Sequence, residues 1–187
     1  VQDLNTKRFY VPTSTSAGVF TYSCINGNFK PSLNEQPTLC QEVTPVSGTL
    51  ASAGSSLSAD GLVISNGAIY GAMGTSNGLL IVTCASVSNV NCAGYPKTLA
   101  TDYQSGSNNV RLQDLGAGKL AIGFNRTVDS KVSAICFDLT TQAACGRVDS
   151  QAAGLTSQPL GLFNVIALQG FCAFSIESMS QTACIDF

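Results

Sequence analysis

The sequence contains no histidine, no tryptophan and few charged side chains. The absence of histidine excludes a Ser-His-Asp triad, a Cys-His pair and any histidine-ligated metal centre. Only 11% of the 187 residues are charged, and 11 acidic and 9 basic side chains give a net charge of −2. An ordinary soluble protein has about 25% charged residues. Because the few basic residues are scattered and the net charge is negative, the sequence predicts no nucleic-acid partner.

The sequence also has no long hydrophobic run. No stretch approaches the roughly 18 consecutive apolar residues of a transmembrane helix, so we expect no membrane span. Val1–Lys7 lacks the basic start and apolar core of a signal peptide, so we expect a chain that was processed or cut from a longer precursor. Apolar residues still make up 44% of the sequence. The length and this composition predict one domain, residues 1–187, with a buried core.

Eight cysteines are present, and no Cys-x-x-Cys spacing occurs among them. They fall into four neighbouring pairs along the chain: Cys24/Cys40, Cys84/Cys92, Cys136/Cys145 and Cys172/Cys184. Eight cysteines allow 105 connectivities, so the spacing favours this pairing without proving it. An even count in local pairs is typical of disulfides in an oxidising compartment, which predicts an extracellular or cell-surface location. No histidine and almost no basic residue flanks these cysteines, so structural disulfides are favoured over redox-active ones.

Short apolar, β-branched runs separated by Gly, Ser, Asn and Asp clusters predict an all-β fold. Between Gly61 and Pro96 the pattern predicts a four-stranded antiparallel meander, with strands at 62–65, 68–73, 79–84 and 91–94. The first two turns contain Asn66-Gly67 and Asn77-Gly78, and both dipeptides tolerate the positive φ that tight hairpins require.

A related unit recurs four times along the chain, at approximately 1–45, 56–96, 110–149 and 160–187. Each unit has a strand, a longer apolar strand that carries a Cys, a hairpin and a short strand that carries a second Cys. Ser/Gly/Ala-rich connectors at 47–58, 101–109 and 150–157 separate the units, and we interpret these as crossings between sheets rather than domain linkers. Two departures from regularity stand out. The first unit carries a long insertion at Ile25–Thr38, and Cys172 lies three residues from the position that aligns with Cys136, which would turn it to the other face of its sheet.

Candidate functional side chains are few. Asp60, Asp114 and Asp129 are the carboxylates that a glycoside hydrolase would need, but all three lie in turn-like segments, where Asp commonly supports the turn itself. Four tyrosines could stack on sugars, although half-buried core positions are the more common role of strand tyrosines: Tyr22, Tyr70, Tyr95 and Tyr103. Asn125 begins an Asn-Arg-Thr glycosylation sequon. We therefore predict no catalytic residue, no metal site and no cofactor.

Two stretches of the chain, Ala134–Cys145 and Val82–Pro96, resemble β-propeller blade repeats. They are most similar to the secreted variety in which a Cys pair cross-links the outer hairpin of each blade. The resemblance implies four blade-like antiparallel sheets that form a small β-propeller or a half-propeller. It also implies that ligands or partners bind at one face of the ring.

Low charge and a positive mean hydropathy of +0.22 leave a surface poorly protected against association. This weakly charged surface and the absence of any predicted set of catalytic residues together predict a non-catalytic extracellular structural or interaction subunit. We expect it to be part of a surface or filamentous assembly. Its expected partner is a second copy or a related chain. The alternative is a carbohydrate-binding or glycoside-cleaving β-propeller whose ligand the sequence does not identify.

Overall fold

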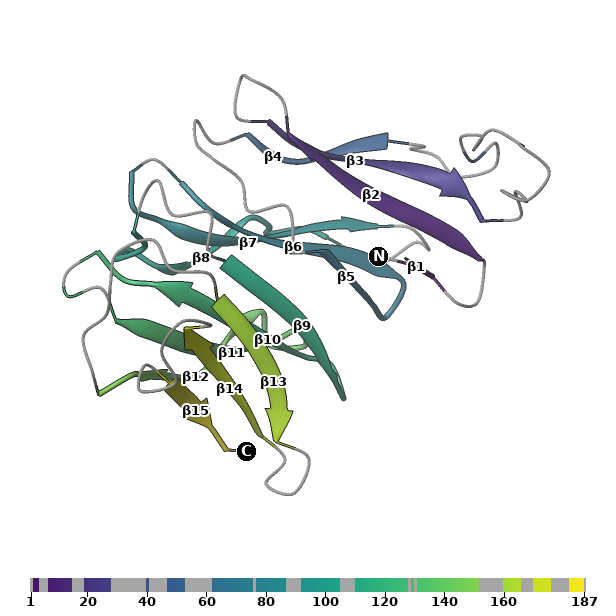
Figure 1. The fold of residues 1–187 in the computed structure, drawn as a ribbon. Coiled ribbons are helices and arrows are strands. Elements are labelled where there is room, and N and C mark those ends of the chain that lie inside the picture. The colour runs from purple at the N-terminus through teal and green to yellow at the C-terminus, as the bar shows by residue number, and fades with distance from the viewer. Residues whose placement is uncertain are drawn as a thin grey trace.

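The computed structural model describes residues 2–3, 7–14, 19–27, 40, 47–52, 62–75, 77–86, 92–104, 110–127, 129, 131–151, 160–165, 170–175 and 182–186. In this part of the chain the protein is all-β, with four antiparallel sheets (Figure 1). Each sheet is a meander, in which every strand pairs with its neighbour in sequence. The fold class predicted from the apolar runs is thereby confirmed at the level of four antiparallel sheets.

Sheets 1 and 2 are built from the N-terminal half. Sheet 1 contains β1 (Gln2–Asp3), β2 (Arg8–Ser14), β3 (Val19–Asn26) and β4 (Ser47–Ser52). Sheet 2 contains β5 (Leu62–Ser65), β6 (Ala68–Gly74), β7 (Leu80–Ser86) and β8 (Lys97–Ala100).

Sheets 3 and 4 follow in the same order. Sheet 3 contains β9 (Val110–Gly116), β10 (Lys119–Asn125), β11 (Val132–Asp138) and β12 (Ala143–Asp149). Sheet 4 has three strands, β13 (Leu160–Val165), β14 (Gly170–Ser175) and β15 (Thr182–Ile185).

The sheets stack in chain order, and a hydrophobic cluster fills each of the three junctions. Between sheets 1 and 2, Tyr10 and Cys24 pack with Ile69 and Met73. The largest cluster joins sheets 2 and 3 and includes Phe124. The junction of sheets 3 and 4 is made by seven small or β-branched residues and one aromatic: Ala121, Val132, Ala134, Cys136, Phe171, Ala173, Ala183 and Ile185.

The central strands β6 of sheet 2 and β10 and β11 of sheet 3 are covered on both faces, which explains their continuous apolar sequences. On β10, Leu120 and Ile122 face sheet 2 while Ala121 between them faces sheet 4. All seven residues of β6 are buried for the same reason. A strand buried on both sides shows no alternation of polar and apolar residues, so its sequence reads as one apolar run.

The turns at one end of the stack require positive φ. Asn66 has φ 50° and is followed by Gly67 at 77°, as the Asn-Gly hairpin signal predicts. The β9–β10 turn has three such residues in a row, Gly116–Gly118. Leu139 N donates to Gly118 O at 2.8 Å, so the β11–β12 turn lies against the β9–β10 turn. We call the end that carries these turns, together with Cys40, Cys92 and the β11–β12 turn, the disulfide rim.

The opposite end carries the crossing from sheet 2 to sheet 3, and we call it the crossing rim. Tyr103 N donates to Gly78 O, and Gln104 N donates to Asn125 O, both at 2.9 Å. These bonds tie the crossing to the β6–β7 and β10–β11 hairpins. The Tyr103 ring covers Gly74, where an added Cβ would lie 1.9 Å from the ring. Only glycine fits that position.

Two strand placements differ from the sequence prediction. The segment 47–58, predicted as a connector, contains β4 instead, which pairs with β3 beyond the predicted boundary at 45. The fourth strand of sheet 2 is β8 at Lys97–Ala100, not 91–94, because Cys92–Tyr95 forms the turn that precedes it. The short strand expected to carry Cys40 in the first unit lies outside the described residues, apart from Cys40 itself.

Candidate functional site

The most concentrated polar structure in the described part of the chain is a group of charged side chains at the crossing rim, which we call the Asp–Arg cluster. It consists of six residues: Asp102, Arg126, Asp129, Lys131, Arg147 and Asp149. Asp102 comes from the crossing after β8, and the others come from the β10–β11 connection and from β12. The cluster therefore joins sheet 2 to sheet 3.

Arg147 is the centre of the contacts. Its Nη1 and Nη2 donate to the two carboxylate oxygens of Asp102 at 3.0 and 2.7 Å, and its Nε donates to Asp149 Oδ1 at 3.1 Å. The guanidinium also lies over the Phe124 ring, 5.2 Å from the centroid. A planar guanidinium is suited to two-bond contact with a carboxylate and to stacking on an aromatic ring.

Arg126 makes a second bridge between the same carboxylates. Its Nε lies 3.0 Å from Asp102 Oδ2, and its Nη1 donates to Asp149 Oδ2 at 2.5 Å. Asp129 lies 3.6 Å from Arg126 and 3.7 Å from Lys131. Three cations (Arg126, Lys131 and Arg147) balance three carboxylates (Asp102, Asp129 and Asp149), so the cluster carries no net charge.

These contacts keep the carboxylates ionised. Burial alone would raise the pKa of Asp102, but hydrogen bonds and charge from Arg147, with the charge of Arg126, lower it below its ordinary value. At Asp149 burial is again outweighed, here by the Ser133 hydroxyl and the two arginines, and the pKa is lowered. A general acid needs a pKa raised towards neutrality. Neither carboxylate meets that requirement, and the arrangement is suited to holding two sheets together.

The carboxylates predicted as turn residues or glycosidase candidates can now be placed. Asp114 accepts a hydrogen bond from Gly116 N at 2.8 Å, in the β9–β10 turn. Asp129 accepts one from Lys131 N at 3.3 Å and joins the Asp–Arg cluster. Both carboxylates therefore support turns, as the turn interpretation predicts. Asp60 lies outside the described residues.

All four predicted disulfides are present: Cys24–Cys40, Cys84–Cys92, Cys136–Cys145 and Cys172–Cys184. Cys172, which does not align with Cys136 in the sequence, lies directly opposite Cys184 in the β14–β15 register. The pairs differ in exposure. Cys24 and Cys40 are both buried, whereas Cys145 and Cys184 are exposed.

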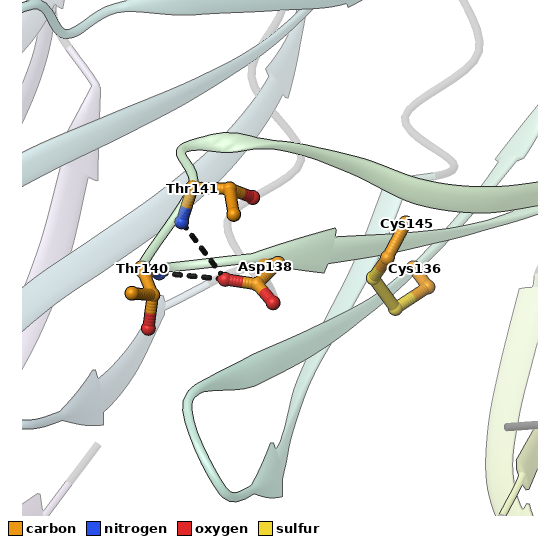
Figure 2. Close-up of a disulfide and its surroundings, with 5 residues drawn as sticks. All are labelled: Cys136, Asp138, Thr140, Thr141 and Cys145. Atoms are coloured by element: carbon orange, nitrogen blue, oxygen red, sulfur yellow. Dashed lines mark hydrogen bonds between the residues drawn. A yellow bond between two sulfur atoms is a disulfide. The ribbon is translucent and has the colours of Figure 1, made fainter.

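Figure 2 shows the Cys136–Cys145 disulfide behind the β11–β12 turn, whose geometry Asp138 fixes. The Asp138 carboxylate accepts hydrogen bonds from Thr140 N at 2.7 Å and Thr141 N at 2.9 Å. The bonds from Thr141 and Thr140 lower the pKa of this carboxyl group below its ordinary value. A carboxylate that caps its own turn is a structural group, and the sequence analysis did not single it out.

The tyrosines proposed as sugar-stacking residues lie mostly in the core. Tyr70 and Tyr103 are buried, and the Tyr70 and Tyr95 ring centroids are 5.9 Å apart in the junction of sheets 2 and 3. Burial and the neighbouring Tyr70 raise the pKa of Tyr95 to about 12. The Tyr95 hydroxyl is buried and has no hydrogen-bond partner among the residues that the structure describes. The Tyr22 side chain is outside the described residues.

Asn125, the sequon residue, is the last residue of β10 and only 3% exposed. The Thr127 hydroxyl of the same sequon donates to Asp102 O at 3.3 Å. A glycan on a side chain this deeply buried would have to displace its surroundings. The structure thus argues against a sugar at Asn125 in the folded protein.

Sequence reasoning missed the Asp–Arg cluster as a unit. The residues of the cluster come from three separate segments of the chain. The only local signal for it is that Arg147 and Asp149 lie on the same face of one strand. Among the described residues no group of three His, Cys, Asp or Glu side chains is placed to hold a metal ion. The same part of the chain contains no helix long and apolar enough to cross a membrane. Comparison with protein-family models and with curated proteins finds no match for this chain.

Proposed function

We propose that the chain is a non-catalytic structural or interaction subunit of an extracellular assembly. The main support for the proposal is the position of the charged side chains, many of which contact one another inside the Asp–Arg cluster. Six of the 20 charged side chains lie in the Asp–Arg cluster, where Asp102 from the sheet 2 side contacts Arg126 and Arg147 from sheet 3. A protein with so few charges, six of them in one internal cluster, has fewer left to keep copies apart.

The location proposal rests on the disulfides. Four disulfides in a domain of 187 residues are typical of extracellular proteins, since the cytosol keeps thiols reduced. Extracellular or cell-surface proteins also need resistance to unfolding without chaperones. Cross-linked hairpins supply part of that resistance by restricting the unfolded chain.

We further propose that the four sheets are blades of a half-propeller or small propeller. Each sheet is a meander, and the first strands of sheets 2, 3 and 4 (β5, β9 and β13) are neighbours in space. Figure 1 shows β9 and β13 side by side. A propeller places the first strand of each blade nearest the axis in this way. A half-propeller needs a second chain to complete its ring, which agrees with a role as a subunit.

One observation favours the alternative of carbohydrate binding. Polar side chains from different sheets meet at the disulfide rim, where a Cβ at Gly118 would lie 3.8 Å from Thr140 Oγ1 and 3.9 Å from Asn66 Nδ2. Hydroxyl and amide groups of this kind recognise sugars. The buried tyrosines, however, leave this rim without a stacking platform from Tyr70 or Tyr103.

Imaging and binding assays separate the two functions. Negative-stain images of the concentrated, oxidised protein should show dimers, rings or filaments, and a glycan array should show no specific binding. The proposal would be overturned if the images showed only small discrete particles and the protein bound glycans. That binding would also have to be abolished by Asn66→Ala and by Thr140→Ala. Gln113→Ala, on β9 away from the turn, is the matched control for those two variants.

A further inference from the structure

The strand β12 is an outer edge of sheet 3 with a free side. It pairs with β11, and within the described residues no strand pairs with its other edge (Figure 1). Five of its seven residues are exposed. Val148 is 40% exposed and, with Val11, is one of two exposed large hydrophobic residues in the described chain. An edge of this length presents a row of backbone donors and acceptors to another strand.

Both ends of β12 are held in place. The Cys136–Cys145 disulfide fixes it near its start, and Arg147 and Asp149 in the Asp–Arg cluster fix it near its end. One face lies towards the crossing that carries Asp102, and the other lies towards Ile185, 3.7 Å from where a Cβ at Gly146 would be. A strand that is already ordered loses little conformational entropy on pairing.

The edge has only part of the usual protection. Natural edge strands are commonly blocked by Pro, by charged side chains, by β-bulges or by being very short. Strand β12 has seven residues without Pro or Lys, and its two charged side chains, Arg147 and Asp149, contact each other. Its register shift against β11 lies at Cys145, away from Val148. The last strands of the other three sheets are shorter: β4 has six residues, and β8 and β15 have four each. Strand β12 is therefore the better template for pairing.

Its sequence is complementary to itself in the antiparallel direction. If two copies pair about a two-fold axis at Val148, Val148 faces Val148 of the second copy, and Arg147 faces Asp149 of the second copy. In the new strand pair, side chains of opposite charge then lie opposite each other, and so do the two valines. Such cross-strand pairs stabilise antiparallel pairing. The Arg147–Asp149 contact lies on one face of the strand, so the two charge clusters would join.

We propose that β12 is the self-association surface of this protein and that its occupant is β12 of a second copy, paired antiparallel about Val148. The pairing joins the C-terminal ends of the two β12 strands through Arg147, Val148 and Asp149 of each copy, so that the two four-stranded sheets become continuous there. It is an isologous contact, so it closes on itself as a dimer. This inference rests on the proposed function, because it names the surface by which the subunit assembles.

Two lysine variants test the surface. Val148→Lys adds a charge at the proposed axis, and Val11→Lys is the matched control, since Val11 is 39% exposed on β2 of sheet 1. In sedimentation velocity, Val148→Lys should weaken self-association at least about tenfold, whereas Val11→Lys should stay within about twofold of wild type. Equal effects of the two variants would overturn the β12 assignment while leaving self-association standing. A wild-type protein that does not associate would overturn the assignment and the proposed function together.

A cysteine variant tests the register and does not depend on loss of association. All eight native cysteines are in disulfides, so Val148→Cys introduces the one free thiol. Residues directly opposite in an antiparallel pair have Cα atoms about 4.5–5.5 Å apart, within disulfide range. Mild oxidation should give a covalent dimer with Val148→Cys and none with Val11→Cys. No cross-link with Val148→Cys, in a protein that retains its four native disulfides, would overturn the two-fold pairing.

Discussion

Arg147 and Asp102 lie 45 residues apart in the sequence and meet through two hydrogen bonds, 3.0 and 2.7 Å long. Arg147 belongs to sheet 3, and Asp102 belongs to the crossing that leaves sheet 2. Their side chains are 31% and 20% exposed. The contact fixes sheet 2 against sheet 3 at the crossing rim, while the β11–β12 disulfide acts at the other rim.

Asp102→Asn should lower the free energy of unfolding by about 1–2 kcal/mol, because it leaves Arg147 and Arg126 short of one carboxylate. A double-mutant cycle with Arg147→Gln should give a coupling energy of about 0.5–2 kcal/mol in urea unfolding. Asp114→Asn is the control, since the amide oxygen preserves the turn bond to Gly116. It should change stability by less than about 0.5 kcal/mol. No coupling between positions 102 and 147 would contradict the bridging role.

Acid should destabilise the protein through the same carboxylates. The pKa values of Asp102 and Asp149 are lowered in the folded state. Their contribution is therefore complete above the unfolded-state pKa near 4 and is lost as the pH falls through the lower folded-state values. Unfolding free energies measured between pH 6 and pH 2 should fall below about pH 4.

The Asp102→Asn/Asp149→Asn variant supplies the comparison for this acid loss. Its stability should fall less steeply over the same pH range, because two of the responsible groups are gone. Parallel pH profiles for this variant and the wild type would show that other carboxylates cause the acid loss.

Tyr95→Phe should leave stability unchanged or raise it by up to about 1 kcal/mol, because the hydroxyl is buried without a partner and its desolvation is uncompensated. Tyr95→Ala should instead cost about 2–3 kcal/mol, since it removes the ring that contacts Tyr70 and Phe137. Thermal unfolding of the two variants measures both effects. A marked loss in Tyr95→Phe would show that the hydroxyl makes a stabilising bond.

The disulfides should reduce in order of exposure. Thiol attack requires access to sulfur, and Cys145 and Cys184 are exposed while Cys24 and Cys40 are both buried. Under mild reductant in the folded state, Cys136–Cys145 and Cys172–Cys184 should open before Cys24–Cys40. Timed alkylation and peptide mapping would record the order. Early loss of Cys24–Cys40 would mean that sheet 1 opens more readily than its burial implies.

Local signals account for what the sequence predicted well. The Asn66-Gly67 dipeptide specifies a tight turn through its own backbone preferences, and the structure has both residues at positive φ. Neighbouring cysteines joined by one turn come together whenever the hairpin forms. The same reasoning could not locate β4, because Ser47–Ser52 has the composition of a connector and becomes a strand only by pairing with β3.

Long-range contacts explain what the sequence could not show. Asp102, Arg126 and Arg147 are scattered along the chain, and their meeting depends on how sheet 2 stacks on sheet 3. The same holds for Tyr95, since a tyrosine in a turn has no local signal that distinguishes a sugar-stacking ring from one partly buried in the core. The stacking of the sheets decides both cases, and it is a property of the whole chain.

Sedimentation equilibrium of the oxidised wild-type protein over a wide concentration range tests the proposed assembly role most directly. The account predicts an average mass that rises with concentration above the 19.3 kDa of one chain, with the dimer as the first associated species. A constant mass of 19.3 kDa at every concentration would contradict it.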